Sequence, residues 1–183
     1  IGRTNVIARN IEGYLKNIWV NVVSDENAKV SAKVVNGKGF TIALKSDGTV
    51  WGFGNINDSN SPKEIQVPEE IIDITAGQGH SLLLGKSGTV YSMGTNTKGE
   101  LGTGNVTTHK NPVAIDLNNI VKIQANMQTS FAIDSNGVMY AFGNGYTKTP
   151  TSIINNKNVI DASKTYHLTD EGKVIKTVTN EEI

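Results

Sequence analysis

Histidine, serine and carboxylate side chains are the groups in this sequence that could support catalysis. His80 and Ser81 are adjacent in the sequence, and they have the residue types of a general base and a nucleophile. Neighbouring residues of a β-strand point to opposite faces of the sheet, so these two side chains cannot act on each other. We therefore expect both residues to be structural, with the imidazole of His80 hydrogen-bonded to backbone.

Acidic residues offer a second route to chemistry. Asp58, Glu64 and Glu100 could serve a hydrolase or lyase that acts on a glycan, provided that two of the carboxylates face each other roughly 5–9.5 Å apart. Asp47 and Asp134 recur beside turns, where Asp stabilises the local backbone, and a turn needs such a residue in every copy of a repeat. We therefore expect no catalytic residue and retain the glycan-acting enzyme as an alternative.

Metal and cofactor sites are not indicated. The chain has 3 His and no Cys, and His109 and His167 lack partners at metal-ligand spacing. The Gly-x-Gly pairs at 37–39 and 77–79 lack the third glycine and the following helix of a nucleotide-binding loop. The sequence predicts no metal and no cofactor.

All these residues lie within an internal repeat. Three clear copies, at residues 30–62, 69–110 and 119–149, align on the turn glycines Gly48, Gly88 and Gly137, which are 40 and 49 residues apart. A degenerate copy covers about 155–180, with Gly172 at its turn, and 1–29 could form a partial copy around Gly13. Periods of this length are typical of propellers and solenoids.

Each copy has the pattern of a β-meander. Apolar and polar residues alternate with period two on both sides of an Asp-Gly, Ser-Gly or Asn-Gly turn, which predicts a hairpin with a two-residue loop. One further strand precedes each hairpin, and another opens at Pro62, Pro112 or Pro150, as suits an edge strand. Four short antiparallel strands per copy predict an all-β fold, a propeller or partial propeller of about four blades in a single domain over 1–183.

Composition and charge limit the classes of partner that we expect. The formal net charge is +0, the isoelectric point is about 7.0, and no apolar run approaches a membrane span. A neutral chain lacks the basic excess of proteins that grip phosphates, so we expect no nucleic acid partner and no membrane insertion. The Asn-rich, Cys-free composition suggests a bacterial extracellular or cell-surface protein, with the cytoplasm as the other option.

One stretch resembles a known family. Residues 77–104, GQGHSLLLGKSGTVYSMGTNTKGELGTG, look like the regulator of chromosome condensation (RCC1) repeat. The second copy keeps the family's glycine cluster, His-Ser, Val-Tyr and Leu-Gly, but has Met93 where the family favours Trp and Glu100 where it favours Gln. The first and third copies have Phe40 and Thr129 in the place of His80 and lack the Gly-Gln-Leu-Gly tail.

The resemblance implies a fold more firmly than a function. The family is a scaffold put to several uses, among them guanine nucleotide exchange on a small GTPase with chromatin binding, ultraviolet sensing and inhibition of β-lactamases. Its propellers usually have seven blades, and this chain is too short for seven. It is therefore a smaller propeller, a fragment, or one part of a homodimer that completes the ring.

The loops that differ between copies are the remaining candidates for recognition, because loops on a rigid repeat carry binding residues. They cover residues 55–63, 95–110 and 144–150. The sequence predicts a non-catalytic module that binds an unidentified protein, and nucleotide exchange is a further alternative implied by the family. The residues expected at the contact are Asn57, Asp58, Asn96, Lys98, His109 and Tyr146.

Overall fold

The computed structural model describes residues 2–9, 15–22, 30–154, 158–163 and 165–177, which form strands and turns and contain no helix. No membrane-spanning helix is therefore present in this part of the chain. The predicted turn at Gly13 lies outside the described residues. On either side of it, β1 (Gly2–Arg9) and β2 (Leu15–Val22) pair as a two-stranded antiparallel sheet.

Four larger sheets follow, and we call them the first to fourth blades. Each is a meander whose strands pair in chain order. The first blade has β3 (Lys33–Gly37), β4 (Phe40–Leu44), β5 (Val50–Gly54) and β6 (Ser59–Ile65). The second has β7 (Ile71–Ala76), β8 (His80–Gly85), β9 (Val90–Gly94) and β10 (His109–Ala114). The third has β11 (Ile120–Asn126), β12 (Thr129–Asp134), β13 (Met139–Gly143) and β14 (Thr151–Ile154). The fourth has β15 (Val159–Ala162), β16 (Tyr166–Thr169) and β17 (Val174–Lys176).

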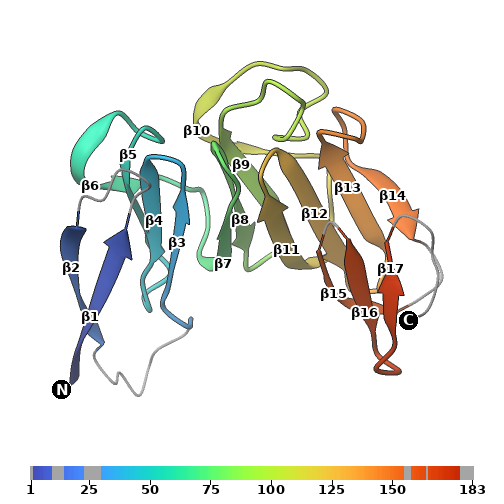
Figure 1. Cartoon of the computed structure of the whole chain (residues 1–183), viewed down its shortest axis with the longest axis horizontal. Helices are drawn as coiled ribbons and strands as arrows, with labels where there is room; N and C mark the ends of the chain where they lie inside the picture. Colours follow the sequence, from blue (N-terminus) through green and yellow to red (C-terminus); the bar gives the residue numbers. More distant parts are fainter. Residues whose placement is uncertain (1, 10–14, 23–29, 155–157, 164, 178–183) are drawn as a thin grey trace.

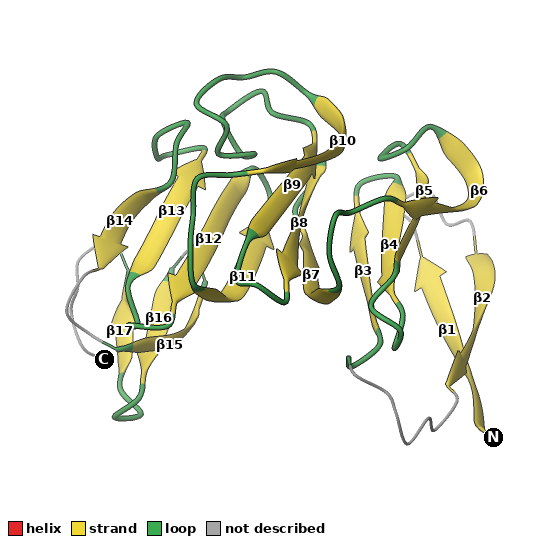
Figure 2. Ribbon diagram, turned by 180° about the vertical axis from the view of Figure 1, so that it is seen from behind, coloured by secondary structure: helices red, strands yellow, loops and turns green. Residues whose placement is uncertain are grey.

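The blades stand side by side in chain order, as Figures 1 and 2 show from opposite sides. Strand β7 contacts β3 of the blade before it and β11 of the blade after it, so the leading strands lie along one edge of the assembly. The β1–β2 sheet and the fourth blade lie at opposite ends of the longest axis (Figure 1). The described sheets therefore form an open fan, which confirms the predicted all-β propeller or partial propeller.

The hydrophobic core lies between blades rather than in one centre. Strand β8 shows why, because it is buried on both faces. Leu83 packs in a cluster with the first blade, whereas Leu82 and Leu84 pack in a cluster with Ile120 and Ile123 of the third. A third cluster joins the third and fourth blades. Alternation with period two thus supplies one apolar face to each neighbour, and each fully buried Leu contributes roughly 1.5–3 kcal/mol.

The hairpin turns differ in one detail from the predicted two-residue loops. The N–H of Lys45 donates to the carbonyl of Thr49, and the N–H of Gly48 donates back to the carbonyl of Lys45, which closes a three-residue loop. The same pair of hydrogen bonds recurs around Gly88, Gly137 and Gly172. Each turn glycine has a positive φ of 73–85°, so it occupies the left-handed position that ends this type of loop.

Turn glycines also join neighbouring blades. The carbonyls of Gly48, Gly88 and Gly137 accept hydrogen bonds, at 3.1–3.2 Å, from the N–H of the residue that opens the next blade. A Cβ at Gly137 would lie 2.5 Å from the Cα of Asn158 in that next blade. Glycine is therefore required here both for its φ and for the close approach of two backbones.

Candidate binding face

The loops that join the third and fourth strands of successive blades emerge on one side of the fan, at the top of Figure 1. They span residues 55–58, 95–108 and 144–150, and we call this side the loop face. The turns at Gly48, Gly88 and Gly137 lie on the opposite side, the hairpin face. The fold therefore brings residues 55–58, 95–108 and 144–150 of the three predicted loops to a common face. Residues 59–63 and 109–110, which were also expected in these loops, instead belong to β6 and β10 because they pair with β5 and β9.

Asn96 organises the longest of these loops and does not point to solvent. It is fully buried, and its Nδ2 donates to the carbonyl of Asn105 at 3.1 Å and to the hydroxyl of Thr103 at 3.2 Å. Its Oδ1 accepts the N–H of Leu101 at 2.9 Å. Because all its hydrogen bonds turn inward, Asn96 shapes the loop face without being accessible to a partner.

Glu100 is also structural, although it is a carboxylate in a candidate loop. Its side chain is buried, and one carboxylate oxygen accepts the N–H of Lys98 at 2.5 Å. Its carbonyl accepts the hydroxyl of Ser130 at 2.7 Å, which ties the loop to the third blade. Lys98, in contrast, is exposed on the loop face.

The Ser130 hydroxyl is shared with a histidine that comes from the second blade. Nε2 of His80 lies 2.8 Å from Oγ of Ser130, and both residues are fully buried. Because Oγ donates its proton to Glu100, the geometry assigns a proton to Nε2 of His80, which then donates to Oγ. The expected backbone partner of His80 is thus a side-chain hydroxyl from another blade.

The His80–Ser130 pair does not have the properties of a base with its nucleophile. The serine proton points to a carbonyl, and neither residue reaches solvent. Nδ1 of His80 is buried and has no hydrogen-bond partner within the described segments, and burial lowers the pKa of His80 to about 4. The neutral imidazole therefore serves as an interior link between blades.

Asp58 and Asn57 lie at the start of the outermost strand of the first blade. Asp58 forms an exposed ion pair with Lys110 of β10, so it bridges the first and second blades at the loop face. Asn57 is half-buried, and its amide donates to the carbonyl of Gly52 at 2.7 Å. An exposed pair such as Asp58–Lys110 contributes only about 0–1 kcal/mol, so both charges stay available to a ligand.

Tyr146 and His109 are half-buried at the other two positions predicted from the sequence. The ring of Tyr146 meets Phe131 edge-on, with 5.8 Å between centroids and 81° between planes, and burial raises the pKa of its hydroxyl. His109 opens β10 and lines a cavity of about 470 Å³ between the second and third blades. Among the six predicted contact residues, Asp58 and Lys98 are thus exposed on the loop face, whereas Tyr146 and His109 are partly buried.

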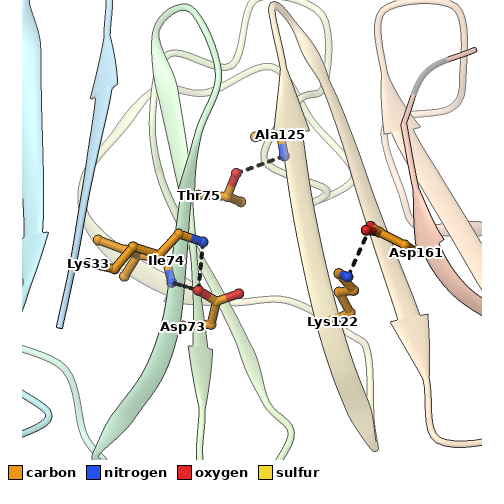
Figure 3. A network of polar contacts seen from close by, with 7 residues as sticks. All are labelled: Lys33, Asp73, Ile74, Thr75, Lys122, Ala125 and Asp161. Atoms are coloured by element: carbon orange, nitrogen blue, oxygen red, sulfur yellow. Dashed lines mark hydrogen bonds and ion pairs between the residues drawn. The ribbon is translucent and has the colours of Figure 1, made fainter. Parts of the chain in front are cut away.

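Polar contacts also hold the leading strands of the blades together, as Figure 3 shows. Lys33 pairs with Asp73 at 2.8 Å across the first and second blades, and Lys122 pairs with Asp161 at 3.0 Å across the third and fourth. Between the second and third blades, the buried hydroxyl of Thr75 accepts the N–H of Ala125 at 3.1 Å. These long-range partners carry no signal in the sequence of either strand alone.

The described residues gather no group of three or more His, Cys, Asp or Glu side chains that could hold a metal ion. The three carboxylates considered for glycan chemistry lie in different settings. Asp58 faces a lysine, Glu100 is buried against the backbone of its own loop, and Glu64 is exposed on β6.

Comparison with known proteins agrees with the repeat architecture. The sequence pattern of the regulator of chromosome condensation (RCC1) repeat matches residues 71–100 and 87–133. Among curated proteins, the Protein RCC2 homolog of Danio rerio is 33% identical over 118 residues, covering 56% of this chain and 24% of the relative. Protein pim1 of Schizosaccharomyces pombe is 28% identical over 144 residues, covering 75% and 26%.

Solved structures show the same fold. Human WBSCR16 superposes with a TM-score of 0.74 at 19% identity, covering 89% of this chain and 51% of that protein. Prp20p of Saccharomyces cerevisiae superposes with a TM-score of 0.71 at 17% identity, covering 94% and 53%. The chain thus spans about a quarter of the curated relatives and about half of these structures. Residues 71–133 thus resemble the RCC1 repeat, and the described sheets have the arrangement of blades in the RCC1-type β-propeller fold.

Proposed function

We propose that this chain is a non-catalytic protein-interaction module that binds its partner through the loop face. The observation that supports this proposal is the contrast between the hairpin face and the loop face. On the hairpin face, every described turn repeats one hydrogen-bonding scheme and the turn carbonyls join blade to blade. On the loop face, the corresponding connections differ in length and sequence, and they expose Asp58, Lys98 and half of Tyr146.

The similar structures support a protein partner. The Prp20p structure was reported with that protein's binding to Gsp1p and histones, and yeast RCC1 (Prp20) was solved bound to Kap60. These statements concern whole proteins of which this chain spans about half. Gsp1p and histones are therefore the first probes to use with this chain.

The other functions receive less support from the described residues. Glycan hydrolysis needs two facing carboxylates, and Asp58 and Glu100 each have a different partner. Nucleotide exchange is implied by the family resemblance alone, and nothing about the loop face favours it over simple binding. The bacterial surface origin and the homodimer stay predictions, and light scattering over a dilution series tests the homodimer.

The experiment compares the two faces in one binding assay. The chain is immobilised, and Gsp1p and histones are applied as analytes. We expect Lys98→Glu on the loop face to change the affinity of the bound analyte about five-fold, since it reverses a charge at the contact. Lys45→Glu on the hairpin face is the matched control and leaves the affinity unchanged. Equal effects of the two variants would contradict the proposal.

A further inference from the structure

A groove separates the outermost strand of the second blade from the third blade. It encloses about 470 Å³, a volume within the range of ordinary ligand sites. One wall is β10 with the end of the 95–108 loop, and the other is the segment that leads into β14. The lining residues are Gly102, Thr103, Asn105, His109, Val113, Ala114, Ile115, Asp116, Thr149 and Pro150.

The backbone of β10 offers a free edge to this groove. Strand β10 is the outermost strand of its sheet and pairs only with β9. The N–H of Ile115 donates to the carbonyl of Val90, so Ile115 is a hydrogen-bonded partner and Ala114, opposite Tyr91, is not. In an antiparallel ladder the N–H and C=O of such an intervening residue point away from the paired strand. Those of Ala114 therefore point outward.

The first blade shows one way in which such an edge is protected. Strand β6 occupies the same place, and its pairing with β5 puts Lys63 and Glu64 where β10 has Val113 and Ala114. Charged residues on an edge strand oppose the addition of another strand, whereas the small apolar pair on β10 does not. Pro112 lacks an N–H, so strand addition is limited to the part of β10 that follows it.

The side chains of the groove specify what could lie there. Val113 and Ile115 make the β10 wall apolar, and Pro150 adds an apolar surface from the opposite wall. Nε2 of His109 is buried and has no hydrogen-bond partner among the described residues. Asp116 is the single acidic side chain in the described lining, and it is exposed where β10 ends. Charge complementarity therefore favours a cationic group at that end.

We propose that this groove binds an extended peptide segment of a partner, which adds to β10 through the backbone of Ala114 and places a basic side chain beside Asp116. This inference rests on the proposed function and names how part of the partner is held. Main-chain hydrogen bonds supply affinity in this mode of recognition, and the side-chain contacts supply specificity. The aliphatic stem of Lys or Arg lies against Ile115 and Pro150 while its charge reaches the carboxylate.

The test uses two fluorescein-labelled heptapeptides of alternating Val and Thr, identical except for Lys or Glu at the fifth position. Fluorescence anisotropy measures their binding to the whole chain. We expect the Lys peptide to bind at least about five-fold more tightly, and Asp116→Lys to reverse the order of the two peptides. Ala114→Pro removes the outward N–H, which β9 does not use, and abolishes the binding of both.

Two controls keep the test decisive. Glu64→Pro makes the same change at the matching position of β6 and leaves peptide binding unchanged. If Ala114→Pro does not fold, ¹⁵N NMR of the unaltered chain replaces it, and the Lys peptide shifts and protects the amide of Ala114. No saturable binding, or equal affinities before and after Asp116→Lys, would overturn the proposal. The face-specific assay with Gsp1p and histones could still succeed in that case, so the two failures are distinguishable.

Discussion

Nε2 of His80, in the second blade, lies 2.8 Å from Oγ of Ser130, in the third, and neither side chain is exposed to solvent. The hydroxyl of Ser130 in turn donates a hydrogen bond to the carbonyl of Glu100, in the 95–108 loop of the second blade. One buried chain of hydrogen bonds thus joins two sheets and the longest loop of the loop face. Its integrity determines how firmly that face is held.

This link predicts a loss of stability in mild acid. Burial lowers the pKa of His80 to about 4, below its ordinary value of 6.5, so the unfolded chain binds the proton first. The contribution of the neutral imidazole is complete above pH 6.5 and is lost as the pH falls toward 4, by up to about 3 kcal/mol. Urea unfolding at a series of pH values measures this change.

The control for this prediction comes from the repeat itself. The first blade has Phe40 at the matching position, so His80→Phe is the natural non-titrating replacement. This variant should flatten the free energy of unfolding between pH 6.5 and 4. A pH dependence that survives in His80→Phe would show that another group is responsible.

Removing the Ser130 hydroxyl should destabilise the chain. In Ser130→Ala, the buried Nε2–H of His80 and the carbonyl of Glu100 both lose their partner, which costs about 1–3 kcal/mol. Ser81→Ala is the matched control, because Ser81 is equally buried and its hydroxyl has no hydrogen-bond partner among the residues that the structure describes. Chemical unfolding of the two variants should therefore differ, and an equal loss would refute the role assigned to Ser130.

Substitution by alanine should change the free energy of unfolding by different amounts at two turn glycines. Both Gly137 and Gly172 have positive φ, so each substitution costs about 1 kcal/mol of backbone strain. At Gly137 the new Cβ also meets the backbone of Asn158, whereas at Gly172 no atom of the described part of the chain lies within 4 Å. We expect Gly137→Ala to lower the free energy of unfolding by at least about 1 kcal/mol more than Gly172→Ala. Thermal unfolding of both proteins measures the difference.

Among the contacts of Figure 3, the buried one should matter most. Thr75→Val leaves the N–H of Ala125 without an acceptor and should cost about 1–3 kcal/mol. The pair Lys122–Asp161 is largely exposed, so a double-mutant cycle should give a coupling below about 1 kcal/mol, sensitive to salt. A coupling larger than the cost of Thr75→Val would reverse this ranking.

The sequence predicts the strands better than the contacts between them. The alternation of apolar and polar residues and the turn glycines are local signals, so they locate each hairpin, including the one whose turn contains Gly172. The three-residue loop at Gly48 was predicted as two residues, because the same dipeptide suits both types. The partner of His80 could not be identified from the sequence, since Ser130 lies 50 residues away and every copy has candidates.

The candidate site shows the same limit. Residues 95–108 were candidates for recognition because this loop differs between copies of the repeat. The direction of each side chain within the loop, however, depends on the folded path of its backbone. Asn96 and Glu100 turn inward to hold that path, and Lys98 between them points outward. The groove beside β10 had no signal at all, because its walls come from two blades.

Hydrogen–deuterium exchange with and without the analyte that binds, Gsp1p or histone, tests the central claim most directly. The proposed function predicts added protection in peptides covering residues 95–108 and 144–150 of the loop face. It predicts no change in the turns around Gly48, Gly88 and Gly137 of the hairpin face. Protection confined to those turns would contradict it.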